Sequence, residues 1–436
     1  MLNDNILTSI DEIIKNHRVF LVGGYLRNYY INNEISNDRD LVCLDDAQKL
    51  AQEITEFLDG TFIELDSENK IYRVVLKDKI NYFDISQALN NNILDDAKRR
   101  DFTINSIYYD LNKNEIFDPL NGIEDIQNKI LKTCDYNNLI DDKLRLLRLY
   151  RFYSLTGFKI EDDLNDFVKN NFEKINEVAK ERINYEIIQI FNSKYLVETL
   201  LKMLDDGVLE KVFPFVKEIK RIPKNSHHHL DLIHHSIETV KNIETNNPIL
   251  KLAAFYHDIG KPATWTIEPK GRHRFIGHDL KGAQIVKKEL EELKFSNKQI
   301  SYIQDMVKYH IYPASLINCA DNKKAYARFV RRLGVNTPDV IKLSKADRLS
   351  ALGEDVTKEM VEKSLLHLEN LQKYYDDVKD IANNPKPIID GNEIMKILNI
   401  KPSKLIGEII DELKEMQLSG EISTKEEAIK YVISRR

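Results

Sequence analysis

Two aspartates separated by one residue, Asp38 and Asp40, begin an apolar run that continues through Leu41 and Val42. Side chains two residues apart on a strand point to the same face, so both carboxylates can hold divalent cations together. Two Mg²⁺ ions held in this way suit phosphoryl transfer, because they stabilise the attacking and the leaving oxygens. An exposed Asp-x-Asp turn is the commoner meaning of three such residues alone, so the prediction depends on neighbouring motifs.

A glycine turn stands upstream of these aspartates. Gly23 and Gly24 separate the apolar run 19–22 from a predicted helix over 25–32. Glycines in this place let backbone N–H groups approach a phosphate, and the N-terminus of the following helix favours an anion. Arg27, in the first turn of that helix, is placed to bind a phosphate oxygen. Together with the two aspartates, the turn indicates a nucleotidyltransferase palm.

A third segment, Arg-Arg-Asp-Phe-Thr-Ile-Asn, runs from Arg99 to Asn105. Two adjacent arginines and an aspartate beside an apolar run are costly to bury unless they pair with each other or bind an anion. The residues alone leave both possibilities open, a structural Arg–Asp pair and an anion site.

The segment 141–152 predicts one helix on which Asp142 and Arg145 share a face. Aspartate accepts a hydrogen bond from an exocyclic amino group, whereas arginine donates to ring acceptors. Cytosine and adenine both offer an amino donor beside a ring acceptor, so one such pair can admit both bases and reject uracil and guanine. From spacing alone, an i,i+3 salt bridge remains the alternative, with Arg148 and Arg151 on a solvated face.

A second set of metal-ligating residue types lies further along. His257 and Asp258 belong to an apolar segment, 253–261, which predicts a helix ending at a glycine. Adjacent buried His and Asp usually pair or bind a metal. Candidate ligands recur in order around them: His235, His278, His310 and Asp347. The remaining histidines of this region are interpreted as bystanders: His227, His228, His229 and His234.

As an ordered set, the first motifs resemble the bacterial tRNA nucleotidyltransferase/poly(A) polymerase family over roughly residues 15–190. A fourth motif, Asp-Pro-x-x-Gly-x-x-Asp from Asp118, belongs to the same resemblance. Members add CCA, or part of it, to tRNA 3′ ends, or add A tails, without a nucleic-acid template. The resemblance implies that Asp38 and Asp40 are the catalytic ligands of two Mg²⁺ ions. It also implies nucleotide binding by Gly23, Gly24, Arg27, Arg100, Asp101 and Asn105.

The segment 141–145 resembles the Glu-Asp-x-x-Arg base-reading motif of this family, with Asp141 in place of Glu. This resemblance implies that Asp142 and Arg145 read the base of CTP or ATP, with Arg148 on the same nucleotide-binding segment. Glu181, Arg182 and Glu186 stand where the family has a structural buttress for this helix. One departure is Asn28, where the family commonly has Asp.

The order His, His-Asp, His, His, Asp resembles HD-domain metal-dependent phosphohydrolases. This resemblance implies a divalent transition metal or Mg²⁺ on His235, His257, Asp258 and Asp347, with His278 and His310 available for a second metal. Some members of the polymerase family carry such a domain. A 2′,3′-cyclic phosphate, a nucleotide and a 2′-phosphate all stay open as its substrate.

The elements that must position these residues define a mixed head and a helical remainder. Short β-type runs at 19–22, 40–44, 71–76 and 82–85 surround predicted helices at 25–32 and 46–58, and the last two runs form a hairpin. From about residue 141, apolar residues recur at helical spacing. We expect an α+β protein whose mixed α/β nucleotidyltransferase palm precedes an all-α neck, a helical HD domain and a helical tail. The expected boundaries are 1–133, 134–222, 223–352 and 353–436.

Composition restricts the location and the partners. The chain of 436 residues has a net charge of −6 and three cysteines without CxxC spacing, which favours a reducing cytoplasm. No apolar run approaches the roughly 18 residues of a membrane span, and the first residues do not form a signal peptide. Because the net charge is negative, any RNA must be bound by local basic patches. One candidate for tRNA phosphate contacts, with a solvated face as the alternative, is a helix carrying Lys323, Lys324, Arg328, Arg331 and Arg332.

The leading functional hypothesis is a template-independent enzyme that adds CCA to tRNA 3′ ends from CTP and ATP and releases pyrophosphate. The short connection 86–94 stands where the family has a mobile loop linked to the switch from C to A, so A-only or CC-only addition is a serious alternative. Three other functions remain as alternatives: poly(A) synthesis, an HD-type phosphohydrolase with a docking head, and a non-catalytic RNA-binding protein. Asp84 is either a third carboxylate near the metals or an ordinary edge-strand residue.

Overall fold

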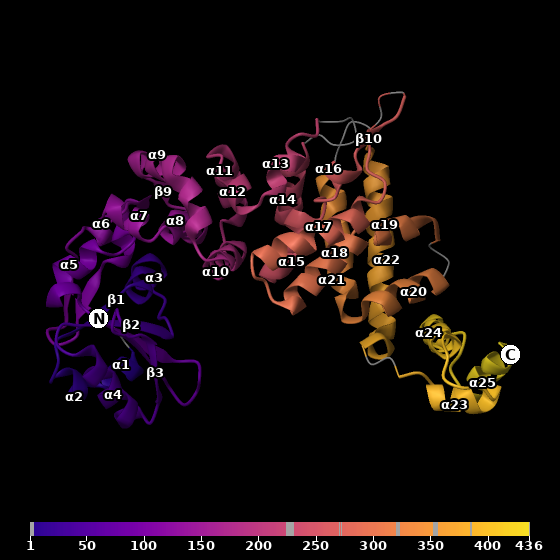
Figure 1. Cartoon of the computed structure of the whole chain (residues 1–436), viewed down its shortest axis with the longest axis horizontal. Coiled ribbons are helices and arrows are strands. Elements are labelled where there is room, and N and C mark those ends of the chain that lie inside the picture. The colour runs from indigo at the N-terminus through magenta and orange to yellow at the C-terminus, as the bar shows by residue number, and fades with distance from the viewer. Residues whose placement is uncertain are drawn as a thin grey trace. The chain divides into compact units, whose positions relative to one another are not determined.

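The computed structural model describes residues 4–223, 231–269, 271, 273–319, 323–351, 356–383 and 386–435. The chain forms two compact units. The first unit comprises 1–186 and 193–195, and the second comprises 187–192 and 196–436. In Figure 1 the first unit runs from indigo into magenta and the second continues to yellow.

The first unit is built on a seven-stranded sheet with the order β3-β4-β5-β2-β1-β6-β7. The β2–β5 pair is parallel and the other pairs are antiparallel. Its strands are β1 (Val19–Val22), β2 (Asp38–Cys43), β3 (Thr61–Asp66), β4 (Ile71–Val75), β5 (Tyr82–Gln87), β6 (Tyr108–Asp110) and β7 (Glu115–Phe117). Helix α3 (Gly24–Asn32) follows β1, and α4 (Ala47–Leu58) contacts β4 and β5 with its buried side chains Leu50, Ala51 and Ile54.

The rest of this unit is mostly helical. Its elements are α1 (Asn5–Ser9), α2 (Asp11–Ile14), η1 (Leu89–Asn91), α5 (Ile93–Lys98), η2 (Thr103–Asn105), α6 (Gly122–Gln127), α7 (Tyr136–Asp141), α8 (Leu144–Thr156), α9 (Asp162–Asn171), η3 (Phe172–Glu177) and the start of α10 (Lys180–Phe191). Two short strands, β8 (Ile130–Leu131) and β9 (Lys159–Ile160), pair in parallel.

The second unit is helical except for the hairpin β10 (Thr266–Ile267) and β11 (His273–Arg274). Around the histidines lie α14 (Leu232–Asn242), α15 (Pro248–Tyr256), α16 (Lys261–Thr264), α17 (His278–Glu292), α18 (Asn297–Tyr309) and α21 (Thr337–Ser350). The other elements are α11 (Leu196–Asp205), α12 (Leu209–Val212), α13 (Phe215–Ile219), α19 (Tyr312–Ser315), η4 (Leu316–Cys319), α20 (Lys323–Leu333), η5 (Gly334–Asn336), α22 (Lys358–Asn383), α23 (Gly391–Leu398), α24 (Lys404–Ser419) and α25 (Lys425–Ser434). The last three helices share an apolar cluster that includes Ile394, Leu413 and Val432.

The expected fold class, a mixed α/β head followed by helices, is confirmed. Strands β3, β6 and β7 were not predicted, nor were the two-stranded pairs β8–β9 and β10–β11. The four expected domain ranges stay a prediction.

The single helix expected over 141–152 is wrong. Helix α7 ends at Asp141, Asp142 is extended with φ −117° and ψ 93°, and α8 begins at Leu144. The Asp142 carboxylate accepts the N–H of Leu144 at 3.3 Å, because a short acidic side chain can replace the missing helical acceptor where a helix begins. Asp142 therefore precedes the helix that carries Arg145.

Candidate active sites

Three carboxylates meet on neighbouring strands of the first unit. Asp38 and Asp40 lie two apart on β2, and Asp84 on β5 is the register partner of Asp40. One oxygen from each lies within 4.8 Å of one oxygen from each of the other two. Asp84 also accepts two hydrogen bonds of 2.7 Å from Arg73 on β4. The structure thus brings the two predicted ligands together and adds the third carboxylate that the sequence left open.

The charges of this trio favour a cation. Burial and the neighbouring Asp38 raise the pKa of Asp40 to about 7. Burial and Asp84 also raise the pKa of Asp38. The Oδ1 atom of Asp38 is buried without a hydrogen-bond partner among the described residues. Hard carboxylate oxygens that repel one another, one of them buried without a donor, fit Mg²⁺.

Consecutive glycines line this site. Gly23 has φ +77°, which favours glycine, and a Cβ on it would stand 2.5 Å from Oδ2 of Asp40. A Cβ on Gly24, the first residue of α3, would stand 3.4 Å from Nη2 of Arg27. The backbone at the helix N-terminus therefore lies directly against a carboxylate on one side and a guanidinium on the other.

Arg27 is a buried cation that no carboxylate neutralises directly. Its side chain donates to the amide oxygens of Asn28 and Asn105, and among the described residues no acid lies within ion-pair distance of it. Burial, Arg151 and Arg148 lower its pKa to about 10. Asn28 supplies a neutral oxygen where the family commonly has an acid, so the positive charge stays available. A buried guanidinium in this state fits an anion such as a phosphate.

The second arginine of the Arg-Arg-Asp segment is fixed by a buried acid. Nε of Arg100 lies 3.2 Å from Asp96 and 2.9 Å from the hydroxyl of Tyr108, which itself donates to Asp96 at 2.7 Å. Arg99 pairs with the same carboxylate at 2.7 Å. The structural Arg–Asp pair considered for this segment therefore involves Asp96, a residue that the sequence reasoning missed.

Asp101, predicted to bind nucleotide, has internal partners for both oxygens. Oδ1 accepts from Nδ2 of Asn105 at 2.9 Å and from the N–H of Phe102 at 2.8 Å. Oδ2 accepts from Nε and Nη2 of Arg148 at 2.9 and 2.5 Å. The alternative left open by spacing alone, a solvated face for Arg148 and Arg151, does not hold, because both contact the buried Glu186, Arg151 at 2.7 Å.

The proposed base-reading pair is close despite the broken helix. Nε of Arg145 and Oδ2 of Asp142 are 4.0 Å apart, and Arg182 approaches the same carboxylate at 2.8 Å. Nη1 of Arg145 donates to the carbonyls of Arg99 and Asn138 at 2.9 and 3.3 Å. Backbone oxygens thus hold the guanidinium beside the Arg-Arg-Asp segment.

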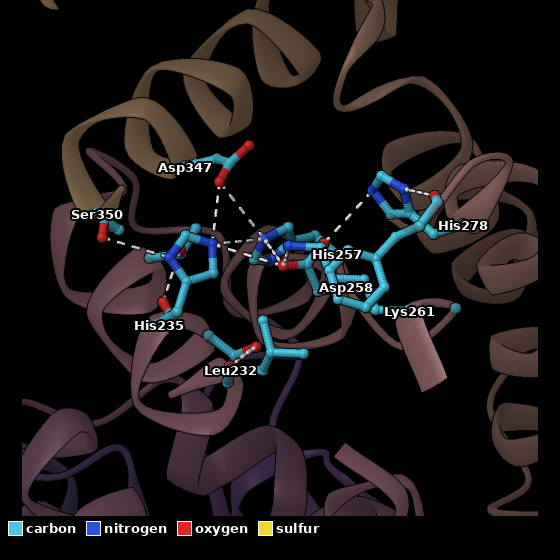
Figure 2. A network of polar contacts seen from close by, with 12 residues as sticks. Leu232, His235, His257, Asp258, Lys261, His278, Asp347 and Ser350 are labelled. Carbon is cyan, nitrogen blue, oxygen red and sulfur yellow. Dashed lines mark hydrogen bonds and ion pairs between the residues drawn. The ribbon is translucent and has the colours of Figure 1, made fainter. Parts of the chain in front are cut away.

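The second unit brings together all six predicted HD residues. Figure 2 shows five of them, which are His235, His257, Asp258, His278 and Asp347. The six are His235 on α14, His257 and Asp258 after α15, His278 at the start of α17, His310 after α18 and Asp347 on α21. Oδ1 of Asp347 lies 3.0 Å from Nε2 of His235. Asp258 directs Oδ2 to His257 at 3.2 Å and Oδ1 to His278 at 3.5 Å, so it lies between two histidine groups.

The histidine rings are oriented for metal binding. The Nδ1 atoms of His257, His278 and His310 lie 2.8, 2.8 and 2.6 Å from backbone carbonyls. A carbonyl only accepts, so these Nδ1 atoms donate and the Nε2 atoms of neutral rings carry lone pairs. The Nε2 atoms of His235 and His257 face each other at 3.2 Å, and so do those of His278 and His310. Facing lone pairs need a proton or a metal between them.

The electrostatics of the site favour one positive charge beside the carboxylates, which a proton on His257 or a bound metal ion supplies. Burial lowers the pKa of His257, but Asp258 and Asp347 outweigh it and raise the value to about 10. Burial and the neighbouring imidazoles lower the pKa of His310 to about 3, which keeps it neutral as a metal ligand must be. Lys261, which the sequence reasoning missed, lies 2.6 Å from Oδ2 of Asp258. Nitrogen and carboxylate donors of this kind fit a divalent transition metal.

Of the four bystander histidines, His234 is half-buried and contacts Asp231, and the other three lie outside the described residues. The basic helix α20 faces acids of α24 and beyond. Three of its five predicted RNA-contacting cations are ion-paired: Lys324 with Glu421, Arg328 with Glu415, and Arg331 with Asp411 and Glu415. Their contact with RNA phosphates stays a prediction. No helix in the described ranges has the length and apolar content to cross a bilayer.

Three stretches of the chain match families of known proteins. Residues 19–132 match the poly A polymerase head domain, residues 157–220 the probable RNA and SrmB-binding site of polymerase A, and residues 227–352 the HD domain. The A-adding tRNA nucleotidyltransferase of Deinococcus radiodurans is 29% identical, covering 94% of each chain. The CC-adding enzyme of Thermus thermophilus is 28% identical, covering 95% of this chain and 93% of that one.

Solved structures share the fold. The Thermotoga maritima CCA-adding enzyme complexed with tRNA aligns over 100% of this chain and 96% of its own, with a TM-score of 0.61 and 20% identity. The Bacillus stearothermophilus CCA-adding enzyme in complex with CTP aligns over 99% and 96%, with a TM-score of 0.65 and 15% identity.

Proposed function

Because this chain is a nucleotidyltransferase of the tRNA nucleotidyltransferase/poly(A) polymerase family and carries an HD domain, we propose that it extends tRNA 3′ ends without a template. In the proposed reaction the terminal 3′-hydroxyl attacks the α-phosphate of CTP or ATP and pyrophosphate leaves. One new phosphodiester bond replaces one phosphoanhydride bond.

The observation that carries this proposal is the contact of two successive glycines with groups of opposite charge. Gly23 lies against Asp40, and Gly24 lies against Arg27. A triphosphate beside this backbone meets a buried guanidinium that lacks an acid, while its cations meet the carboxylates. Positioning of this kind accounts for most of the catalysis in phosphoryl transfer.

Each group then has a definite task. Asp38 and Asp40, with Asp84 beside them, would hold two Mg²⁺ ions, which supply Lewis acidity at the reacting oxygens. Arg27 and Arg100 bind triphosphate oxygens. Asp142 and Arg145 test the base by hydrogen bonds that U and G leave unmade.

The extent of addition separates two versions of this function. Full CCA addition is the expectation from the sequence motifs. Two observations favour addition of only part of CCA: relatives matched over nearly the whole chain are named A-adding and CC-adding, and the connection after β5 is short. That connection holds the turn η1 and then Asn92, whose side chain accepts the N–H of Leu94 at 2.8 Å and starts α5.

The test uses three synthetic tRNAs that end at the discriminator base, at C and at CC, each with CTP, ATP or both and Mg²⁺. Incorporation of C, C and A on the shortest tRNA establishes full CCA addition. Extension of only the CC-ended tRNA by A, or of the shorter ones by C, establishes partial addition. Asp38→Asn with Asp40→Asn is the inactive control, and no extension of any tRNA by the unaltered protein would contradict the proposal.

A second function, metal-dependent phosphate ester hydrolysis, is favoured by the facing Nε2 atoms at the HD residues. His235, His257, Asp258 and Asp347 would hold a first metal, and His278 and His310 would help to hold a second. The test is hydrolysis of 2′,3′-cyclic AMP, 2′-AMP and bis(p-nitrophenyl) phosphate with Mn²⁺, Co²⁺, Ni²⁺ or Mg²⁺. Activity that survives His257→Ala with Asp258→Asn would contradict this assignment.

A further inference from the structure

A continuous chain of hydrogen bonds joins Arg27 to Arg148 within the first unit. Nη1 of Arg27 donates to Oδ1 of Asn105 at 2.7 Å. Nδ2 of Asn105 donates to Oδ1 of Asp101 at 2.9 Å. Arg148 donates to Oδ2 of the same aspartate at 2.9 and 2.5 Å. These three links, defined here as the relay, join the phosphate-side arginine on α3 to the helix α8 that carries Arg145.

The relay has little freedom to rearrange. Arg27, Asn105 and Asp101 are 8%, 6% and 6% exposed. An arginine only donates and a carboxylate only accepts, so the Asn105 amide satisfies both neighbours in one orientation only. Burial alone would raise the pKa of Asp101, but Arg148 and Asn105 hold it well below its usual range. The relay therefore contains a fixed negative charge between two cations.

An aromatic ring brings the same cations together. The guanidinium carbons of Arg27, Arg148 and Arg151 lie 5.2, 5.5 and 4.2 Å from the ring centre of Phe152. Three cations around one ring repel one another, as the lowered pKa of Arg27 reflects. An anion bound to Arg27 relieves this repulsion and strengthens the arrangement that the relay maintains.

We propose that the relay couples triphosphate binding to base selection. A triphosphate that engages Arg27 fixes Asn105 and Asp101, and these fix Arg148 and the first turns of α8, on which Arg145 tests the base. Asn105 and Asp101 act as positioning residues in this scheme. The inference rests on the proposed function, since it assumes that Arg27 meets the triphosphate and Arg145 the base.

The coupling has a measurable signature: the preference for the correct base is larger for a nucleoside triphosphate than for a monophosphate. Dissociation constants of CTP, UTP, CMP and UMP, and of ATP, GTP, AMP and GMP, are measured by calorimetry with Ca²⁺ replacing Mg²⁺. In the unaltered protein the CTP/UTP preference, or the ATP/GTP preference, exceeds the corresponding monophosphate preference at least about five-fold, the lower range of coupling between two sites.

Breaking the relay removes this excess. Asn105→Ala deletes two of its links, and Asp101→Asn keeps the shape but removes the charge that holds Arg148. Both variants are expected to bring the triphosphate preference to the monophosphate value. Ser106→Ala is the matched control, because Ser106 is buried beside the same turn and donates to the Thr103 carbonyl outside the relay. The Ser106→Ala variant is expected to keep a larger base preference for triphosphates than for monophosphates.

Equal preferences for triphosphates and monophosphates in the unaltered protein would overturn the inference. So would an Asn105→Ala variant that binds all nucleotides more weakly by one common factor, since that result describes a purely structural residue. Failure of every triphosphate to bind the unaltered protein would overturn the proposed function, and the inference with it. The two failures are therefore distinguishable.

Discussion

Gly23 and Asp40 approach so closely that a methyl group on the glycine would stand 2.5 Å from a carboxylate oxygen. Gly23 directly follows strand β1, and Asp40 lies on the neighbouring strand β2, where it is the register partner of Val22. The absence of a side chain at residue 23 therefore permits both the turn and the position of the carboxylate.

Gly23→Ala is expected to lower nucleotide addition by about 100-fold or more, because displacement of a catalytic group by about 1 Å has this effect. Gly207→Ala is the control: Gly207 has φ +72°, but no atom lies within 4 Å of its added Cβ. Gly207→Ala carries the backbone strain of an alanine at positive φ, roughly 1–2 kcal/mol. Gly23→Ala carries more, because Gly23 with ψ −138° lies in a region nearly exclusive to glycine, and thermal unfolding reports this difference separately from activity. Rates of single-nucleotide extension and thermal unfolding are measured for both, and equal losses of activity would contradict the steric explanation.

Arg145→Ala is expected to reduce the preference for the correct base over U or G by about 10- to 100-fold, the effect of leaving one or two base hydrogen bonds unmade. The carbonyls of Arg99 and Asn138 hold this guanidinium in place in the unaltered protein. Competition between correct and incorrect triphosphates in extension of tRNA measures the preference. Lys143→Ala is the control. It removes a cation that lies two residues before Arg145 and pairs with Glu177, and it should leave the base preference unchanged.

The two metal sites are expected to fail independently. Asp40→Asn should lower extension of tRNA by about three orders of magnitude, because several kcal/mol of charge stabilisation are lost. It should leave Mn²⁺ binding by the second unit unchanged. His257→Ala should have the converse effect. Extension assays and Mn²⁺ titration monitored by electron paramagnetic resonance test both variants, and a single variant that removes both properties would disprove independence.

Glu289 makes stability depend on pH. It accepts the hydroxyl of Tyr256 at 2.9 Å, and burial raises its pKa to about 7. Between pH 4.5 and 7 the folded protein retains a proton on Glu289 that the unfolded chain has released. The contribution of this proton to the free energy of unfolding is therefore complete below pH 4.5 and is lost as the pH rises through 7. Glu289→Gln should remove about 3 kcal/mol of that dependence. Urea unfolding at pH 5 and pH 8 measures it, and Glu291→Gln, at an exposed position on the same helix, should preserve it.

The sequence predicted the elements whose patterns are local. Strand β1, helices α3 and α4 and the β4–β5 hairpin follow from apolar periodicity and turns. Strand β3 did not, because Ile63 and Leu65 at this sheet edge are exposed and give no half-buried alternation. The break at Asp142 was also hidden, since its effect depends on a side chain accepting a backbone N–H two residues later.

The candidate sites followed from motifs, but their connections did not. Spacing alone allowed Arg148 a solvated face and the resemblance placed it on the nucleotide-binding segment, yet neither indicated that it pairs with Asp101, 47 residues away, and contacts Glu186. Arg331 resembled an RNA contact, yet Glu415 and Asp411 lie against it. Pairings across such separations depend on the folded arrangement, and spacing along the chain carries no trace of them.

The neutral side chain of Asn28 has a consequence for the end of the reaction. A guanidinium that is buried without an acid attracts the departing diphosphate as well as the substrate. In the proposed reaction, inorganic pyrophosphate is then a tightly held product that competes with the next nucleotide. The same affinity favours the reverse reaction, in which pyrophosphate removes the terminal nucleotide, so continuous removal of pyrophosphate would set the net direction of extension.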